Sequence, residues 1–156
     1  NCEKPDKNDI VIHLRVGDSI IGEDKNDFKY NTRNWGTYAI KLETIKKMIP
    51  KIKETNINSV VIVYGAHKKS NKELNEKYIN KVKDLLRMNN FYVREKHNGD
   101  PDKDFLFMAN SKYFVKSGGN FSNIISKIVE LNQGVVFDSI KFNEKNINLI
   151  INTLNI

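Results

Sequence analysis

A short string near the start of the chain, residues 12–18 (IHLRVGD), combines residue types that suit the binding of an anion. It continues an apolar run that predicts a buried strand, and ligands of α/β sheets bind at the carboxyl ends of strands. The guanidinium of Arg15 can hold two phosphate oxygens, and Gly17 lets the backbone come close to a ligand. Because side chains alternate along a strand, His13 and Arg15 are expected on one face. The simpler alternative is a structural ion pair between Arg15 and Asp18.

A glycine-rich turn at residues 117–122 (SGGNFS) is a second candidate anion site. It falls between an apolar run and a helical stripe, so it is expected to join a strand to a helix. Paired glycines allow unusual backbone angles, and a helix N-terminus offers N–H groups and a partial positive charge to an anion. The alternative is an ordinary turn in which Asn120 or Ser122 caps the helix.

Two other places carry residues that could recognise a nucleotide. Asp104 is expected at the start of a short helix. Its carboxylate there either interacts favourably with the helix dipole or accepts two hydrogen bonds from guanine. The loop at residues 33–38 holds the single tryptophan, Trp35. An exposed tryptophan can stack on a sugar or a base, and the alternative is a ring folded back over the first helix.

The elements that must position these residues alternate between strand and helix. Residues 19–36 are expected to form a long irregular loop, and a capping box of Ser70 and Glu73 is expected to open the second helix. This alternation predicts an α/β, Rossmann-like three-layer domain with about five mostly parallel strands. The expected strands are residues 9–15, 60–64, 91–93, 112–115 and 135–137, and the expected helices are residues 37–49, 70–88, 104–110, 121–134 and 143–154.

Composition places limits on the class of protein. The 156 residues suit one domain, and the net charge of +7 permits nucleic acid, anionic membrane or nucleotide partners without selecting one. The lysines are scattered, as on a solvated surface. The single cysteine, Cys2, excludes an internal disulfide, and His13, His67 and His97 lack metal-ligand spacing. With no apolar run long enough for a membrane span and no signal peptide, a cytoplasmic location is expected.

Residues 12–18 resemble the H-x-R-R-G-D motif of the fucosyltransferase superfamily, the α-1,2-, α-1,6- and protein O-fucosyltransferase-like enzymes with a GT-B fold. Residues 104–122 are similar to a later block of that family, in which an aspartate opens a short helix, a strand follows and a turn starts the next helix. The resemblance covers roughly residues 9–130. It implies that residues 1–156 are one donor-binding domain, half of a GT-B fold, within a larger protein whose further domain binds the acceptor.

The resemblance also implies a reaction and a set of residues. A sugar, expected to be fucose, passes from a GDP-sugar to a glycan or protein hydroxyl with inversion, and neither a metal nor another cofactor is required. Arg15 would contact the diphosphate, Asp104 the guanine, and residues 118–122 the phosphates. Arg15, Asp18 and His13 form the expected catalytic set, and the acceptor base is left open among Asp18, Glu23, Asp24 and Asp27. The expected donor-binding residues are His13, Arg15, Gly17, His67, Asp104, Ser117, Gly118, Gly119, Asn120, Phe121 and Ser122.

Other functions remain as alternatives. The second arginine of the family motif is Val16 here, and Gly119-Asn120 replaces a pair of hydroxyl residues, which favours a non-catalytic nucleotide- or glycan-binding module of the same fold. A basic nucleic-acid-binding domain is the third hypothesis. Scattered charge and the lack of an aromatic–basic repeat argue against it, so neither nucleic acid nor membrane is an expected partner. Asn120-Phe121-Ser122 is also a formal glycosylation sequon, which fits a cytosolic location or an unmodified asparagine.

Overall fold

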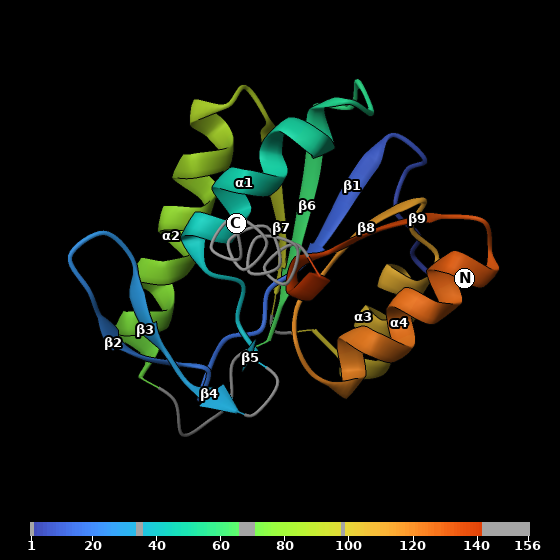
Figure 1. Ribbon diagram of the computed structural model, residues 1–156. Coiled ribbons are helices and arrows are strands. Elements are labelled where there is room, and N and C mark those ends of the chain that lie inside the picture. Colours follow the sequence, from blue (N-terminus) through green and yellow to red (C-terminus); the bar gives the residue numbers. More distant parts are fainter. Residues whose placement is uncertain (1, 34–35, 66–70, 98, 142–156) are drawn as a thin grey trace, which may run out of the picture.

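Five parallel strands form a central sheet in the computed structural model, which describes residues 2–33, 36–65, 71–97 and 99–141 (Figure 1). Strand β1 lies in the middle and pairs with β6 and β8. All five residues of β1 are buried, as expected for a strand that is covered on both faces. Across the sheet the order is β7 (Tyr92–His97), β6 (Ser59–Tyr64), β1 (Asp9–His13), β8 (Tyr113–Lys116) and β9 (Val135–Asp138).

Two helices cover each face of this sheet (Figure 1). On one face, α1 (Leu42–Lys53) and α2 (Lys72–Met88) bury their apolar residues against one set of strand side chains. On the other face, α3 (Pro101–Ala109) and α4 (Asn120–Leu131) pack on a second, smaller cluster. The predicted α/β, Rossmann-like three-layer architecture with five parallel strands is therefore confirmed.

The strand order reverses its direction beside β1. The chain runs from β1 through β6 to β7 on one side, and then crosses to β8 and β9 on the other. The connection after β1 therefore leads toward one edge of the sheet, and the connection after the adjacent β8 leads toward the other edge. Open α/β sheets bind ligands where two such connections diverge. His13 ends β1, and Arg15 follows two residues later.

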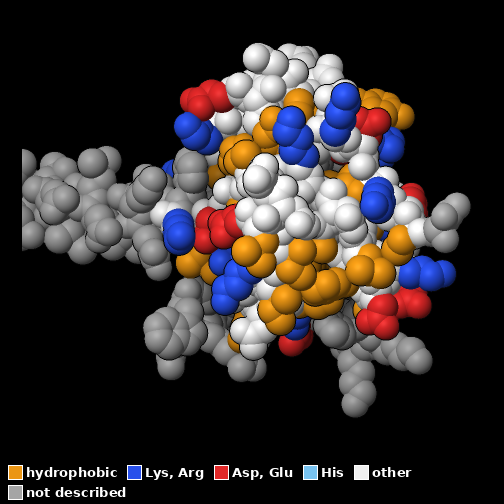
Figure 2. Space-filling model, turned by 90° about the vertical axis from the view of Figure 1, so that its right-hand side faces the viewer, with side chains coloured by type: hydrophobic (Ala, Val, Ile, Leu, Met, Phe, Trp, Pro, Cys, Tyr) orange, Lys and Arg blue, Asp and Glu red, His pale blue; other side chains and the backbone are white. Residues whose placement is uncertain are grey.

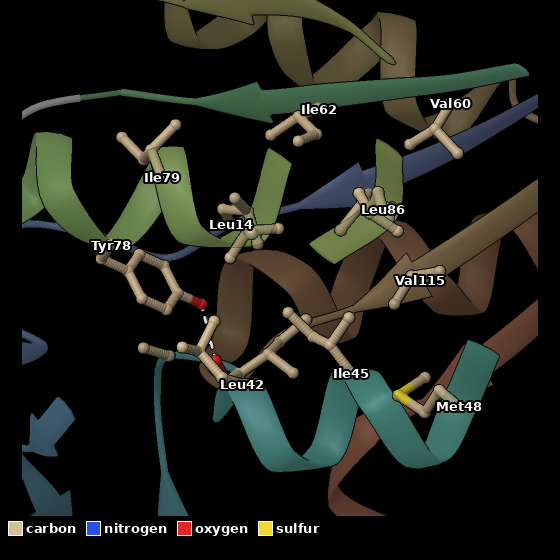
Figure 3. Close-up of a cluster of buried hydrophobic side chains, with 14 of the residues drawn as sticks. Leu14, Leu42, Ile45, Met48, Val60, Ile62, Tyr78, Ile79, Leu86 and Val115 are labelled. Carbon is tan, nitrogen blue, oxygen red and sulfur yellow. Dashed lines mark hydrogen bonds between the residues drawn. The ribbon is translucent and has the colours of Figure 1, made fainter. Parts of the chain in front are cut away.

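The larger core cluster joins α1 and α2 to the sheet (Figure 3). Ile62 of β6 and Ile45 of α1 belong to it, and so does Tyr78 of α2, which is fully buried. The Tyr78 hydroxyl donates a hydrogen bond of 2.6 Å to the carbonyl oxygen of Ile40. This bond satisfies a buried backbone acceptor just before α1 and ties that segment to α2.

The long loop after β1 is not irregular, contrary to the sequence-based expectation. It contains two short hairpins, β2 (Ile20–Glu23) with β3 (Phe28–Tyr30), and β4 (Thr32–Arg33) with β5 (Gly36–Thr37). Ile20 and Phe28 are buried, and the Phe28 ring meets the Tyr78 ring edge-on at 5.6 Å. Ile20 and Phe28 are too far apart in the sequence to give a strand periodicity. Their side chains nevertheless pack the first hairpin against the core.

The first helix starts and ends later than expected. Tyr38 lies before α1, and the Asp27 carboxylate in the first hairpin accepts bonds from the N–H groups of Leu42 and Glu43 at 3.4 and 3.3 Å. Pro50 was expected to end the helix, but it sits exposed within it. A proline there removes one hydrogen bond, and the buried face continues to Ile52.

Two other helix starts also differ from expectation. The N-cap of α2 is Asn71, whose side chain accepts a bond from the Leu74 N–H at 3.1 Å; Ser70 lies outside the described residues. Helix α3 begins at Pro101 with Asp100 as N-cap, so Asp104 is in its first turn rather than at its start. A proline at the first helical position suits this N-terminus.

Helix α4 buries a different face from the predicted apolar stripe. Ile125 is buried as expected, but Phe121 is 36% and Ile124 51% exposed. The rest of the buried face is formed by Ser122, Ser126 and Val129, and the two small serines allow a close approach to the sheet. Hydrophobic side chains consequently gather on the surface of the α3–α4 side of the molecule (Figure 2).

The last predicted helix, residues 143–154, lies outside the described residues. Among the described helices, none has the length and apolar character that a bilayer crossing requires.

Candidate functional site

Two adjoining cavities open at the carboxyl ends of the central strands. The larger, of about 470 Å³, is lined by residues that include His13, Arg15, Gly99 and Asp104. The smaller, of about 400 Å³, lies against the N-terminus of α4 and also has Arg15 in its wall. Arg15 and Phe121 line both cavities. The fold therefore brings together the two sequence blocks that were selected independently as candidate sites.

Arg15 stands at the junction of the two cavities. Its Nη2 lies 3.6 Å from the Asp18 carboxylate, a long contact with a carboxylate that is 69% exposed. Its Nε is buried and has no hydrogen-bond partner among the described residues. The expected ion pair with Asp18 exists, but an exposed pair of this kind contributes little. Arg15 thus has N–H capacity for a ligand.

His13 is held neutral next to this arginine. Its Nδ1 is hydrogen-bonded to the Ser117 hydroxyl at 2.8 Å, and its ring centre lies 5.6 Å from that of Phe121. Burial, and secondarily the positive charge of Arg15, lower the pKa of His13 to about 4. His13 and Arg15 both line the larger cavity, together with Leu14 and Val16 between and after them.

Ser117 and Ser122 support the site from behind. Both are fully buried, and neither is among the described residues that line these two cavities. The Ser117 N–H donates to the Ser122 hydroxyl oxygen at 3.0 Å, which closes the turn between β8 and α4. The two serines were expected among the donor-binding residues; in this structure they shape the turn and hold His13.

The two glycines of this turn have different roles. Gly119, with a φ of +94°, is the N-cap of α4, and no side chain in the described part of the chain caps this helix. A cap by Asn120 or Ser122, the alternative considered from the sequence, is therefore wrong. A Cβ on Gly118 would lie 2.7 Å from both the Thr37 carbonyl oxygen and the Tyr38 Cα, so no side chain fits at this position. Gly118, Gly119 and Asn120 all line the smaller cavity.

Asp104 contributes a buried carboxylate to the wall of the larger cavity. The residue is 7% exposed, and its Oδ1 has no partner among the described residues. Burial raises the pKa of Asp104, partly offset by the nearby Lys96. A Cβ on Gly99 would lie 2.9 Å from this oxygen, so Gly99 packs directly on the carboxylate. An unpartnered buried acceptor is costly, and a ligand with N–H groups would satisfy it.

Gly17 stabilises the loop after β1 and is not among the described residues that line the two cavities. Its φ of +87° is one that only glycine adopts easily, and its N–H donates to Asn75 Oδ1 of α2 at 3.2 Å. Sequence reasoning missed Asn75, although a polar residue beside the buried Leu74 was a signal. Tyr38, the last residue of the candidate loop at residues 33–38, was given no role from the sequence, but it lines the smaller cavity.

Three of the four candidate acceptor bases lie away from Arg15. Glu23, Asp24 and Asp27 line a separate cavity between the first hairpin, α1 and α2, and Asp27 is engaged with Tyr30 and the start of α1. Only Asp18 of this set lines a cavity with Arg15. The predicted site residue His67, and also Trp35, lie outside the described residues, although Gly65 lines the larger cavity.

No protein-family model and no curated protein matches the chain. In the described part of the chain, no group of three or more His, Cys, Asp or Glu side chains could hold a metal ion. The candidate site has two groups that suit an anion, the Arg15 guanidinium and the N-terminus of α4. It also has one group that suits a hydrogen-bond donor, the buried Asp104 carboxylate.

Proposed function

We propose that this domain binds a GDP-sugar across the two cavities and is the donor-binding part of a glycosyltransferase, with GDP-fucose as the donor. One observation carries the proposal: two buried polar atoms without described partners, Arg15 Nε and Asp104 Oδ1, belong to residues that line one continuous site. A guanine nucleotide has the complementary groups, because its diphosphate is an anion and its base carries N–H donors next to each other. Adenine lacks such a donor pair.

Under this proposal, the diphosphate lies in the smaller cavity against the first turn of α4. Transfer joins the acceptor oxygen to the anomeric carbon and breaks the bond to the diphosphate, which leaves with the electron pair. Arg15 and the helix N-terminus would stabilise the negative charge that develops there. Asp18, exposed in the same cavity wall, would accept the proton of the acceptor hydroxyl. The acceptor, a glycan or protein hydroxyl, would be held by a further domain.

Thermal unfolding with GDP, UDP and ADP tests the nucleotide. At one hundred times Kd, GDP is expected to raise Tm by roughly 5–10 °C, whereas UDP and ADP raise it less. Arg15→Ala should abolish the GDP shift. Asp104→Asn should reduce the preference for GDP over ADP, because an amide offers a donor where the base needs an acceptor. Arg87→Ala, on the exposed end of α2, is the matched control and should retain the full shift.

An unshifted Tm in a folded wild-type protein, or an equal response to all three nucleotides, would contradict the proposal. A non-catalytic module that retains GDP binding is the second candidate. The observation that favours it is Val16, which is buried in the larger core cluster where the family motif has a second arginine. GDP binding without any sugar transfer by the full-length protein would decide for the module.

A further inference from the structure

The ring of Tyr38 lies between Arg15 and the glycine turn that opens α4. The Arg15 guanidinium carbon is 5.6 Å from the ring centre, within the range of a cation–π contact. On the turn side, a Cβ on Gly119 would lie 3.3 Å from a ring carbon, so the ring packs closely on this glycine. Tyr38, Arg15 and Gly119 all line the smaller cavity.

The backbone of Tyr38 is held in this place from two directions. The Gly118 N–H donates a hydrogen bond of 2.8 Å to the Tyr38 carbonyl oxygen. Two residues later, the Ile40 carbonyl accepts from the buried Tyr78 hydroxyl, and the side chains of Ala39 and Ile40 are buried. The segment that carries the ring is therefore held by the turn between β8 and α4 and by α2.

A rigid ring at this place matters because an arginine side chain is long and flexible. Ordering it only when the ligand arrives costs conformational entropy that reduces affinity. The plane of an aromatic ring favours one orientation of a guanidinium and leaves the N–H groups at its edge available.

We propose that Tyr38 is a positioning residue that holds the Arg15 guanidinium against the glycine turn, with its N–H groups toward the smaller cavity where a nucleotide diphosphate binds. The inference rests on the proposed function and adds a residue to which the sequence analysis assigned no role. It makes Tyr38 specific for the phosphate half of the ligand, because Tyr38 lines the smaller cavity and Asp104 lines the larger one.

The test measures Kd for GDP and for guanosine, which lacks phosphates, by calorimetry on the 156-residue chain. Tyr38→Leu removes the ring and is expected to weaken GDP binding about 3- to 30-fold while the Kd for guanosine stays unchanged. Tyr38→Phe keeps the ring and should restore GDP affinity to within about twofold of the wild type. Tyr92→Leu, at a tyrosine that is 66% exposed on β7, is the matched control. Tyr38→Gln replaces the leucine variant if leucine prevents folding.

A double-mutant cycle separates positioning from direct contact. If Tyr38 acts through Arg15, Tyr38→Leu causes no further loss of GDP affinity in an Arg15→Ala background. Equal losses in both backgrounds, or a parallel loss of guanosine binding, would overturn the inference. Wild-type GDP binding with an unchanged Tyr38→Leu variant would overturn this inference alone, whereas absent GDP binding by the wild type would overturn the proposed function and the inference with it.

Discussion

Single residues in the candidate site owe their state to neighbours that are distant in the chain. His13 is neutral because β1 is buried in the middle of the sheet and Arg15 lies beside it. Ser117, 104 positions away, fixes the orientation of its ring through a buried hydrogen bond. Burial shifts the pKa of Asp104 in the opposite direction, because it raises the pKa of a carboxyl. One oxygen of this carboxyl has no described partner.

The lowered pKa of His13 predicts an acid-sensitive fold. The unfolded chain takes up a proton near pH 6.5 and the folded chain only near 4, so stability should fall as the pH drops through this window. The loss is on the order of 3 kcal/mol at most. Urea unfolding of the wild type and His13→Gln at pH values from 7 to 4 should show a shallower dependence for the variant. An NMR titration of His13 with a midpoint near 6.5 would contradict the prediction.

At the scale of elements, the segments after β1 are placed by contacts with other elements rather than by their own propensities. The first hairpin supplies the carboxylate that caps α1, and the stretch at residues 37–40 is held by the glycine turn and by α2. The turn between β8 and α4 therefore has two roles. It places the N-terminus of α4 at the smaller cavity, and it hydrogen-bonds the segment that precedes α1.

The packing of this turn predicts a large difference between two glycine substitutions. Gly118→Ala would place a Cβ 2.7 Å from backbone atoms of Thr37 and Tyr38, and backbone cannot move aside cheaply. We expect a loss of about 1–3 kcal/mol, which is roughly 2–10 °C in Tm. Gly65→Ala is the control, because a Cβ there meets no described atom within 4 Å. Equal Tm values for the two variants in thermal unfolding would show that the chain before α1 does not pack as described.

The whole molecule is organised around β1. Alternate residues of this strand enter the two opposite core clusters, Ile12 with α1 and α2, and Val11 with α3 and α4. The surface has a different character: on the face in Figure 2, basic and acidic side chains are interspersed around the apolar side chains.

A shared central strand predicts that the two layers unfold together. Ile12→Ala should lower the free energy of unfolding by about 2–5 kcal/mol, because the side chain is 2% exposed and its removal leaves a cavity. Fluorescence and far-UV circular dichroism should then report one coincident transition at a lower urea concentration. Ile21→Ala, at a side chain that is 63% exposed, is the control and should have little effect. Two separate transitions in the Ile12 variant would mean that the layers are independent.

Local patterns in the sequence were sufficient for the strand–helix alternation, the five strands, and the two blocks that carry Arg15 and Asp104. These features depend on apolar runs and periodicity, which are local properties of the chain. Only the tertiary structure decided the hairpins after β1, the cap of α1 by Asp27, and the places of Tyr38 and Ser117 beside Arg15 and His13. The physical reason is that these contacts join segments up to about a hundred residues apart, and neither partner has a pattern of its own that reveals the other.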